Sequence, residues 1–292
     1  MKLYPLKFNP IFKKRIWGGN KLKTDLNKNF TQNNIGESWE ISDIEGDESV
    51  VANGCYKSQT LKQLIEKFKG KLVGDTVYEQ FGNNFPLLIK FIDAHKPLSV
   101  QVHPNDNYAK INHNSLGKNE LWYIINAEEN AKITIGFKEV LNENVFHTKL
   151  KNNTVMETLN IEEANSGDVF YIPTGRVHAI GAGVLLAEIQ QTSDITYRVY
   201  DYNRINEETG KKRELHINKA LDVINYNDVN NFKTPYKIEE NATSKLVHSP
   251  YFKTNILHVT KYVHRNLSKI DSFKIYMCVE GKATYLYNNH SG

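Results

Sequence analysis

Short apolar and alternating runs dominate the middle of the chain. From Phe85 to Arg204 they follow one another closely, in segments such as LSVQVHP, ELWYIINA, DVFYIP and TYRVYDYNR, with Gly, Pro, Asn or Asp between them. Short runs rich in β-branched and aromatic residues between turn residues are typical of strands. So many short strands in succession predict a mainly β domain, built as a barrel or a sandwich.

Helical periodicity is confined to two places. In LKQLIEKFKG the apolar residues Leu61, Leu64, Ile65 and Phe68 recur at helical spacing, which predicts an amphipathic helix over 61–70 that ends at Gly70. Residues 216–225 show a second helical pattern. We therefore expect only a small helical region beside the strands.

A second series of strands begins after the polar stretch 226–249. We divide the chain into a large β domain over 1–215, a helical connecting segment over 216–249 and a second β unit over 250–292. The run from Phe273 to Asn289 resembles the opening hairpin of another barrel, and the sequence ends before a second closing motif. We expect this C-terminal unit to be incomplete.

The stretch GDVFYIPTGRVH, residues 167–178, has the most specific spacing in the chain. It sets a glycine, five residues, Pro-x-Gly, two residues and a histidine, which is the second half of the cupin barrel signature. The alternating strand is expected to stop at Pro173, turn through Gly175 and send His178 back into the interior. A histidine in that place can bind a metal.

Three further residues are candidates for the same metal site. Gln101 and His103 are two positions apart, so their side chains lie on one face of a strand, and Glu120 opens the next strand after a polar loop. Two imidazoles, a carboxylate and an amide oxygen suit a borderline divalent ion such as zinc. We expect Gln101, His103, Glu120 and His178 to bind one Zn²⁺ per chain and to leave room for water or substrate, which favours catalysis.

The composition excludes several classes of protein. The formal charge of +4 comes from 37 Lys and Arg against 33 Asp and Glu without a basic run, so no nucleic-acid partner is expected. Cys55 and Cys278 lie far apart, which indicates neither a disulfide framework nor a thiolate zinc site and fits a reducing cytosol. Without a long apolar run or a signal-peptide pattern, we expect a cytoplasmic protein with no membrane partner. Nothing in the sequence sets an oligomeric state.

Several motifs together resemble the type I phosphomannose isomerases in their short bacterial form. They are QVHP (101–104), GKNELW (117–122), GDVFYIPTGRVHAI (167–180) and LLAEIQQTSDITYRVYDYNR (185–204), together with NPIFKKRIWGGNKL (9–22) and GESWEIS (36–42). The resemblance covers nearly the whole chain and is specific, because generic cupins keep His-x-His where this chain has Gln101-x-His103. It departs at the end, where family members continue for roughly another barrel half.

The resemblance implies a cupin (jelly-roll) barrel and a zinc-dependent interconversion of mannose 6-phosphate and fructose 6-phosphate. It also implies that the four candidate ligands match the family's metal ligands, and that Arg198 matches its active-site arginine. The other positions that match residues lining the family's pocket are Lys90, Ser99, Lys118, Glu188 and Asp194.

The chemistry of this isomerisation requires a base, a cation and a pocket that excludes water. Hydride-shift isomerases typically use two metals and ligands for only one are found, so we expect proton transfer through a cis-enediol. The base is left open among Glu188 and Asp194, which we expect on strands near the site, and Lys118, which lies two residues from a candidate metal ligand.

Two cations are candidate contacts for the substrate. Arg198 offers planar paired donors to a phosphate or to adjacent sugar oxygens, and its alternative is a salt bridge with Asp201 or Asp194. Lys90 lies in an apolar strand, where a buried ammonium requires an anionic partner, either the phosphate or a pocket carboxylate.

Two other functions remain open on the same barrel. A metal-dependent dioxygenase usually has three or four imidazoles, or two imidazoles and one carboxylate, around iron, and Gln101 as a ligand argues against it. A non-catalytic sugar-binding or regulatory cupin would keep the fold without the chemistry. The complete ligand set, with Lys118 and Arg198, argues against that reading.

Overall fold

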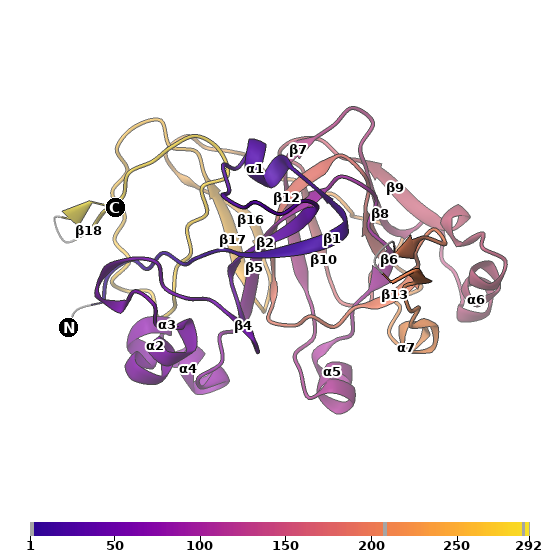
Figure 1. Cartoon of the computed structure of the whole chain (residues 1–292), viewed down its shortest axis with the longest axis horizontal. Coiled ribbons are helices and arrows are strands. Elements are labelled where there is room, and N and C mark those ends of the chain that lie inside the picture. The colour runs from indigo at the N-terminus through magenta and orange to yellow at the C-terminus, as the bar shows by residue number, and fades with distance from the viewer. Residues whose placement is uncertain (1–2, 207–208, 288–289, 292) are drawn as a thin grey trace.

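Two antiparallel β-sheets that face each other form the body of the molecule (Figure 1). The computed structural model describes residues 3–206, 209–287 and 290–291. The six-stranded sheet has the order β1 (Ile11–Gly19), β2 (Ile35–Ile41), β5 (Leu87–Ala94), β12 (Val184–Gln191), β7 (Glu120–Ala127), β10 (Val169–Ile172). The five-stranded sheet has the order β13 (Tyr197–Tyr200), β6 (Val100–Val102), β11 (His178–Ile180), β8 (Lys132–Phe137), β9 (Leu159–Glu163). This two-sheet sandwich is the mainly β architecture that the density of short strands predicts.

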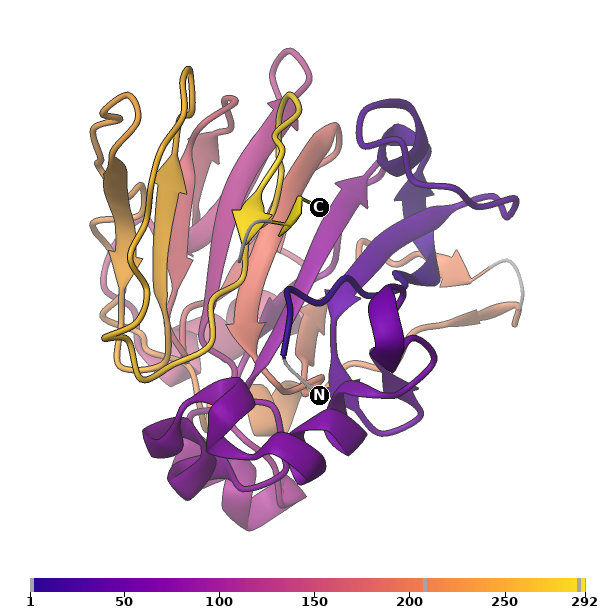
Figure 2. The same ribbon diagram turned by 90° about the vertical axis from the view of Figure 1, so that its left-hand side faces the viewer.

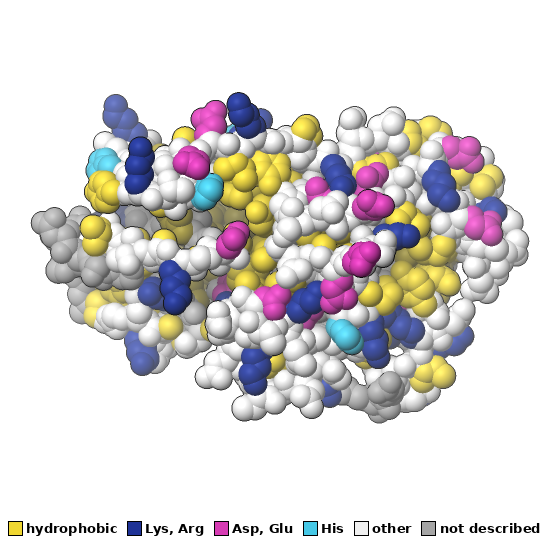
Figure 3. Space-filling view, turned by 90° about the horizontal axis from the view of Figure 1, so that it is seen from above, with side chains coloured by type: hydrophobic (Ala, Val, Ile, Leu, Met, Phe, Trp, Pro, Cys, Tyr) yellow, Lys and Arg dark blue, Asp and Glu magenta, His cyan; other side chains and the backbone are white. Residues whose placement is uncertain are grey.

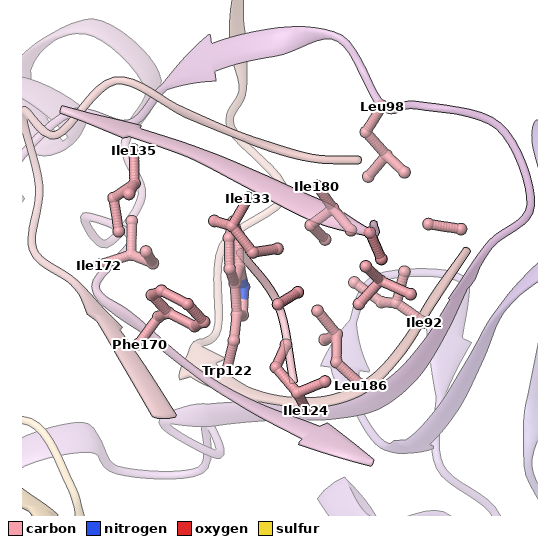
Figure 4. Close-up of a cluster of buried hydrophobic side chains, with 14 of the residues drawn as sticks. Ile92, Leu98, Trp122, Ile124, Ile133, Ile135, Phe170, Ile172, Ile180 and Leu186 are labelled. Atoms are coloured by element: carbon pink, nitrogen blue, oxygen red, sulfur yellow. The ribbon is translucent and has the colours of Figure 1, made fainter. Parts of the chain in front are cut away.

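The inner faces of the two sheets bury a common apolar core (Figure 4). Trp122, Ile124 and Leu186 come from the six-stranded sheet, and they pack against Ile133 and Ile180 of the five-stranded sheet. Because successive side chains of a strand point to opposite faces, the residues between these positions face outward. The core therefore fixes which side chains of β5, β7 and β12 enter the space between the sheets.

Helices and a further hairpin cover the outer faces. α6 (Glu143–Lys151), the 3₁₀ turn η2 (Val155–Glu157) and α7 (Ile217–Leu221) pack on the five-stranded sheet, where Phe137, Phe146 and Val199 belong to one buried cluster. On the six-stranded sheet lie α2 (Leu61–Phe68), α3 (Gly70–Val73), α4 (Asp75–Phe81) and the hairpin of β16 (Thr243–His248) and β17 (Lys253–Leu257). These elements cover much of the outer face of each sheet, while β9 at the edge of the five-stranded sheet keeps exposed residues such as Ile161.

The first predicted helix ends two residues earlier than expected. α2 begins after Thr60, whose side chain forms a capping box with Gln63, and it ends at Phe68 rather than at residue 70. Lys69 then adopts a positive φ of 49°, and Gly70 opens α3 instead of closing α2. A Cβ at position 70 would lie 1.9 Å from Asp75 Oδ1, so the glycine serves the close approach of α3 and α4.

The C-terminal residues follow a different course from the expected hairpin. β16 begins at Thr243, inside the segment predicted to be a connection, and the predicted hairpin over 273–289 is not formed among the residues described there. Phe273, Ile275 and Met277 alternate toward the outer face of the six-stranded sheet instead, with Val279 after them. This segment lies across a sheet face rather than along a sheet edge, so its alternation half-buries side chains without a ladder. In Figure 2 the yellow C-terminal trace passes in front of the sheet.

The remaining elements are short. They are β3 (Asp43–Ile44), β4 (Asp47–Glu48), β14 (Ile205–Asn206), β15 (Lys211–Lys212), β18 (Leu286–Tyr287), β19 (His290–Ser291), α1 (Lys21–Thr24), α5 (Asp106–His113) and the 3₁₀ turn η1 (Gly54–Tyr56). Within the described ranges, none of the helices is long and apolar enough to cross a membrane. On the face seen from above, acidic and basic side chains are interspersed (Figure 3).

Candidate metal centre

Three side chains that are far apart in the sequence meet between the two sheets. His103, Glu120 and His178 each offer a ligand atom, and these atoms all lie within 4.8 Å of one another. His103 Nε2 is 3.4 Å from one Glu120 oxygen, and His178 Nε2 is 3.7 Å from the other. All three residues are buried. The geometry is that of a candidate site for a divalent cation.

The Pro-x-Gly turn places His178 as the sequence predicts. β10 ends at Ile172, Gly175 adopts a φ of +85°, and β11 begins at His178. The Gly175 amide donates to the carbonyl of His103 at 3.0 Å, which ties the turn to a second candidate ligand. A Cβ on Gly175 would lie 2.9 Å from the carbonyl oxygen of Val223, so the position requires glycine for its space as well as for its φ.

The strand register aligns further site residues in one row. His178 on β11 pairs with Gln101 on β6, and Gln101 pairs with Arg198 on β13. Directly paired residues in antiparallel strands project on the same face. Glu120 enters from the opposite sheet as the first residue of β7. The site therefore draws on both layers of the sandwich.

Both imidazoles are oriented by the backbone. His103 Nδ1 donates to the carbonyl of Ile195 at 2.9 Å, and His178 Nδ1 donates to the carbonyl of Arg176 at 2.8 Å. A carbonyl can only accept, so these bonds place the proton on Nδ1 and leave Nε2 with a free lone pair. This is the arrangement in which histidine commonly ligates a metal.

The charge states of the three residues suit a cation. Burial, and then the Lys118 ammonium, lower the pKa of His103 to about 3, and burial also lowers the pKa of His178. Burial alone would raise the pKa of the Glu120 carboxyl, but Lys118 and the two histidines hold it well below its usual range. Two neutral imidazoles and one carboxylate are therefore present at neutral pH.

The hydrogen bonding leaves the same atoms without partners. His103 Nε2 and both carboxylate oxygens of Glu120 are buried and make no hydrogen bond. Glu120 Oε1 has the Lys118 ammonium 3.1 Å away, but among the described residues nothing donates a hydrogen bond to His103 Nε2 or Glu120 Oε2. Unsatisfied buried acceptors are costly, so this cluster of acceptor atoms indicates a site for a cation. Zn²⁺ fits this donor set of imidazole nitrogen and carboxylate oxygen.

Gln101 lies beside this cluster. Its Nε2 is 3.3 Å from His178 Nε2, and a half-turn of the amide group would present the side-chain oxygen at the same place. The structure thus brings together all four residues that the sequence nominated as ligands. Lys118 lies at the rim of the cluster, with its Nζ 3.1 Å from a Glu120 oxygen.

A buried ion pair lies next to the cluster on the six-stranded sheet. Lys90 Nζ is 2.7 Å from Glu188 Oε1, and both side chains are less than a tenth exposed. Glu188 is thus the anionic partner that the apolar strand around Lys90 requires. Burial lowers the pKa of Lys90, but Glu188 and Glu37 outweigh it and raise that pKa overall; burial and the Glu120 carboxylate raise the pKa of Glu188.

Two aromatic residues and one acid that the sequence reasoning did not nominate complete this pair. Trp122 Nε1 donates to Glu188 Oε2 at 2.8 Å, and its ring lies edge-on to His178 with 5.2 Å between centroids. Glu37 accepts from Trp39 Nε1 at 2.6 Å and carries a pKa of about 2, where Lys90 and Arg15 overcome the effect of burial. The alternation in GESWEIS places Glu37 and Trp39 on one strand face, and this was the signal available in the sequence.

Arg198 is held by two bonds at the edge of the site. Its Nε donates to Ser99 Oγ at 3.1 Å, and its NH1 donates to the carbonyl of Glu214 at 2.9 Å. Asp201, the alternative partner considered from the sequence, pairs with Arg204 and Arg213 instead. Ser99 thus orients Arg198, and among the described residues NH2 of the guanidinium makes no hydrogen bond and forms a free edge.

Asp194 stands apart from the other nominated residues. It is exposed and lies in the loop between β12 and β13, not on a strand as the sequence reasoning assumed. On either side of Asp194 the loop is fixed by its backbone. The carbonyl of Ser193 accepts a hydrogen bond from Gln190, and the carbonyl of Ile195 accepts one from His103. The structure therefore does not bring Asp194 into the buried cluster.

Most of this chain is similar to proteins of one known family. Residues 5–149 match the model of the phosphomannose isomerase type I catalytic domain. Mannose-6-phosphate isomerase ManA of Bacillus subtilis is 42% identical over 86% of this chain and 78% of its own length, and a mannose-6-phosphate isomerase of Streptococcus mutans is 38% identical over 85% and 77%.

The fold agrees with a solved relative as well. The crystal structure of the mannose 6-phosphate isomerase from Bacillus subtilis matches with a TM-score of 0.77 at 35% identity, covering 85% of this chain and 78% of that chain. Sequence identity at this level over most of both chains is evidence of common descent rather than of a shared fold alone. This chain belongs to the type I phosphomannose isomerase family.

Proposed function

We propose that this protein interconverts mannose 6-phosphate and fructose 6-phosphate by proton transfer through a cis-enediol, with one Zn²⁺ bound by Gln101, His103, Glu120 and His178. The observation that carries the proposal is the buried cluster of His103, Glu120 and His178, whose ligand atoms lie within 4.8 Å of one another beside the Lys90–Glu188 ion pair. Membership of the family supports the choice of substrate. A sugar phosphate is the expected small-molecule partner.

The zinc ion would supply Lewis-acid stabilisation of negative charge on the sugar oxygens. The residues around the zinc site would bind and orient the substrate. Lys90 is a buried cation that stays charged, because three carboxylates, Glu188 first, raise its pKa, and it offers N–H donors to oxygens of the sugar. Arg198, oriented by Ser99, has the free edge of its guanidinium to donate to the phosphate or to adjacent hydroxyls.

The proton transfer between C2 and C1 requires a group that accepts and returns a proton. Glu188 is our choice for this base, because burial and Glu120 raise the pKa of its carboxyl toward the working range. Trp122 and Lys90 hold its two oxygens in place. Lys118 stays a second candidate at 3.1 Å from Glu120, and Asp194 is the weakest of the three because it is exposed.

A joint metal analysis and activity assay tests the proposal. The purified protein is expected to contain zinc and to form fructose 6-phosphate from mannose 6-phosphate. Iron with oxygen consumption would indicate the dioxygenase alternative, and neither activity in the metal-loaded protein would indicate a sugar-binding cupin. In deuterated water the product is expected to carry solvent deuterium, whereas a hydride shift would leave it unlabelled.

A further inference from the structure

A cavity of about 280 Å³ lies beside β13, away from the metal centre. Its walls include Val199, Tyr200 and Ile217, which belong to or pack against the cluster on the outer face of the five-stranded sheet. Arg198, which precedes Val199 on β13 and pairs with Gln101, projects on the same face as Gln101 and His178, toward the metal centre. The cavity and the metal centre are therefore on opposite sides of this sheet, at the end of the molecule where α6 and α7 lie (Figure 1).

The charges on the cavity wall are strongly unbalanced. The lining includes one acidic side chain, Asp201. It also includes four basic side chains, those of Lys151, Arg204, Lys212 and Arg213. Both oxygens of Asp201 are already used, because Arg204 Nε donates to Oδ1 at 3.2 Å and Arg213 Nε donates to Oδ2 at 2.8 Å. An excess of positive charge is left facing the cavity.

Two of the basic groups are also preorganised to bind an anion. The shared carboxylate holds the guanidinium groups of Arg204 and Arg213 in place, so little side-chain entropy remains to be lost on binding. Lys151 makes no hydrogen bond or ion pair within the described part of the chain and is exposed at the end of α6. Guanidinium and ammonium groups together bind phosphate through charge-assisted hydrogen bonds.

The rest of the wall sets the size and character of the ligand. Leu150, Val199 and Ile217 provide an apolar surface next to the charges. The volume lies just below the range for small-molecule sites, about 300 to 1,000 Å³, which indicates a small ligand. A ligand with one anionic group and a small carbon body fits these features better than a bare ion or a large cofactor.

We propose that this cavity binds a small phosphate monoester at a site separate from the metal centre. Its occupant would contact Arg213, whose neighbour Glu214 accepts a hydrogen bond from Arg198 NH1. His216, on the same segment, donates its backbone amide to the carbonyl of Arg198 at 2.8 Å. Occupancy therefore acts on the segment that orients Arg198, and through it on substrate binding.

Calorimetric titration of the zinc-loaded protein with inorganic phosphate tests the site. The variant Lys151→Met/Lys212→Met removes two exposed cavity cations, and Lys219→Met on α7, outside the cavity wall, is the matched control. The double variant is expected to bind phosphate at this site at least about tenfold more weakly, with turnover at saturating mannose 6-phosphate unchanged, while the control binds as the wild type does. Phosphate is expected to bind also at the metal centre, so Arg198→Ala is titrated in parallel to identify that second event.

Two results would overturn the inference. One is equal phosphate affinity and stoichiometry in the wild type and the double variant. The other is a single binding event in the wild type that Arg198→Ala abolishes, because all phosphate would then bind at the metal centre. Neither result would affect the proposed isomerase function, which the turnover assay tests separately.

Discussion

Replacing Lys90 by methionine should lower the unfolding free energy by removing one partner of the buried Lys90–Glu188 ion pair. Methionine keeps the length and apolar character of the side chain but leaves the Glu188 carboxylate without its partner at 2.7 Å. Lys90 is 6% exposed and Glu188 3% exposed, so water cannot replace the lost contact. Breaking a buried pair in this way costs about 3–5 kcal/mol of unfolding free energy.

The loss of unfolding free energy should depend on pH, because Glu188 becomes neutral when it binds a proton and is then no longer an unpaired buried charge. Burial and Glu120 already raise the pKa of Glu188, and the loss of Lys90 removes the main opposing effect. The folded variant then holds a proton that the unfolded chain releases near its ordinary pKa of about 4.3. Its unfolding free energy therefore falls as pH rises through the window between the two pKa values, by at most about 1.4 kcal/mol per pH unit.

Urea denaturation of the wild type, Lys90→Met and Lys90→Met/Glu188→Gln over a pH series measures this effect. Glutamine keeps an acceptor for Trp122 Nε1, so the double variant is expected to recover more than about 2 kcal/mol of the loss at neutral pH. Lys110→Met, an exposed residue of α5, is the control and should stay within about 0.5 kcal/mol of the wild type. A pH-independent loss, or a double variant no more stable than Lys90→Met, would refute the reasoning.

Three further predictions test other parts of the account. Arg198→Lys keeps the charge but loses the planar donors, so kcat should fall steeply with zinc content unchanged, and an unaltered kcat would make Arg198 structural. Gly175→Ala should lower the unfolding free energy by about 1–2 kcal/mol, since φ is +85° and the added methyl group meets the carbonyl of Val223; a wild-type urea midpoint would contradict this. Asp271→Ala should speed amide exchange at Asp75 and Thr76, whose amides donate to the Asp271 carboxylate at 2.6 and 3.0 Å, while β12 stays protected; unchanged exchange at both amides would count against this contact.

The residues of the candidate metal cluster could be selected from the sequence because the constraints there are local. The Pro-x-Gly spacing positions His178, and the two-residue separation of Gln101 and His103 places both near it once the strands pair. Lys90 could also be read correctly, because a lysine in an apolar strand must find an anion. The strand-rich, mainly β architecture followed from the runs themselves.

Other features depend on contacts between distant segments and left little trace in the sequence. Arg198 donates to Ser99 rather than to the nearby Asp201, because the Asp201 carboxylate is already paired with Arg204 and Arg213. The alternation from Phe273 to Val279 was read as a hairpin strand, since period two cannot distinguish a paired strand from an extended segment lying on a sheet face. The division at residues 215 and 249 stays a prediction.

Zinc content and isomerase turnover measured together on one set of variants test the central claim most directly. The wild type should bind one zinc per chain and form fructose 6-phosphate from mannose 6-phosphate. His178→Ala should lose both zinc and turnover, and the control His258→Ala, an exposed histidine, should keep both. A fully metallated and active His178→Ala enzyme would contradict the assignment of the metal centre.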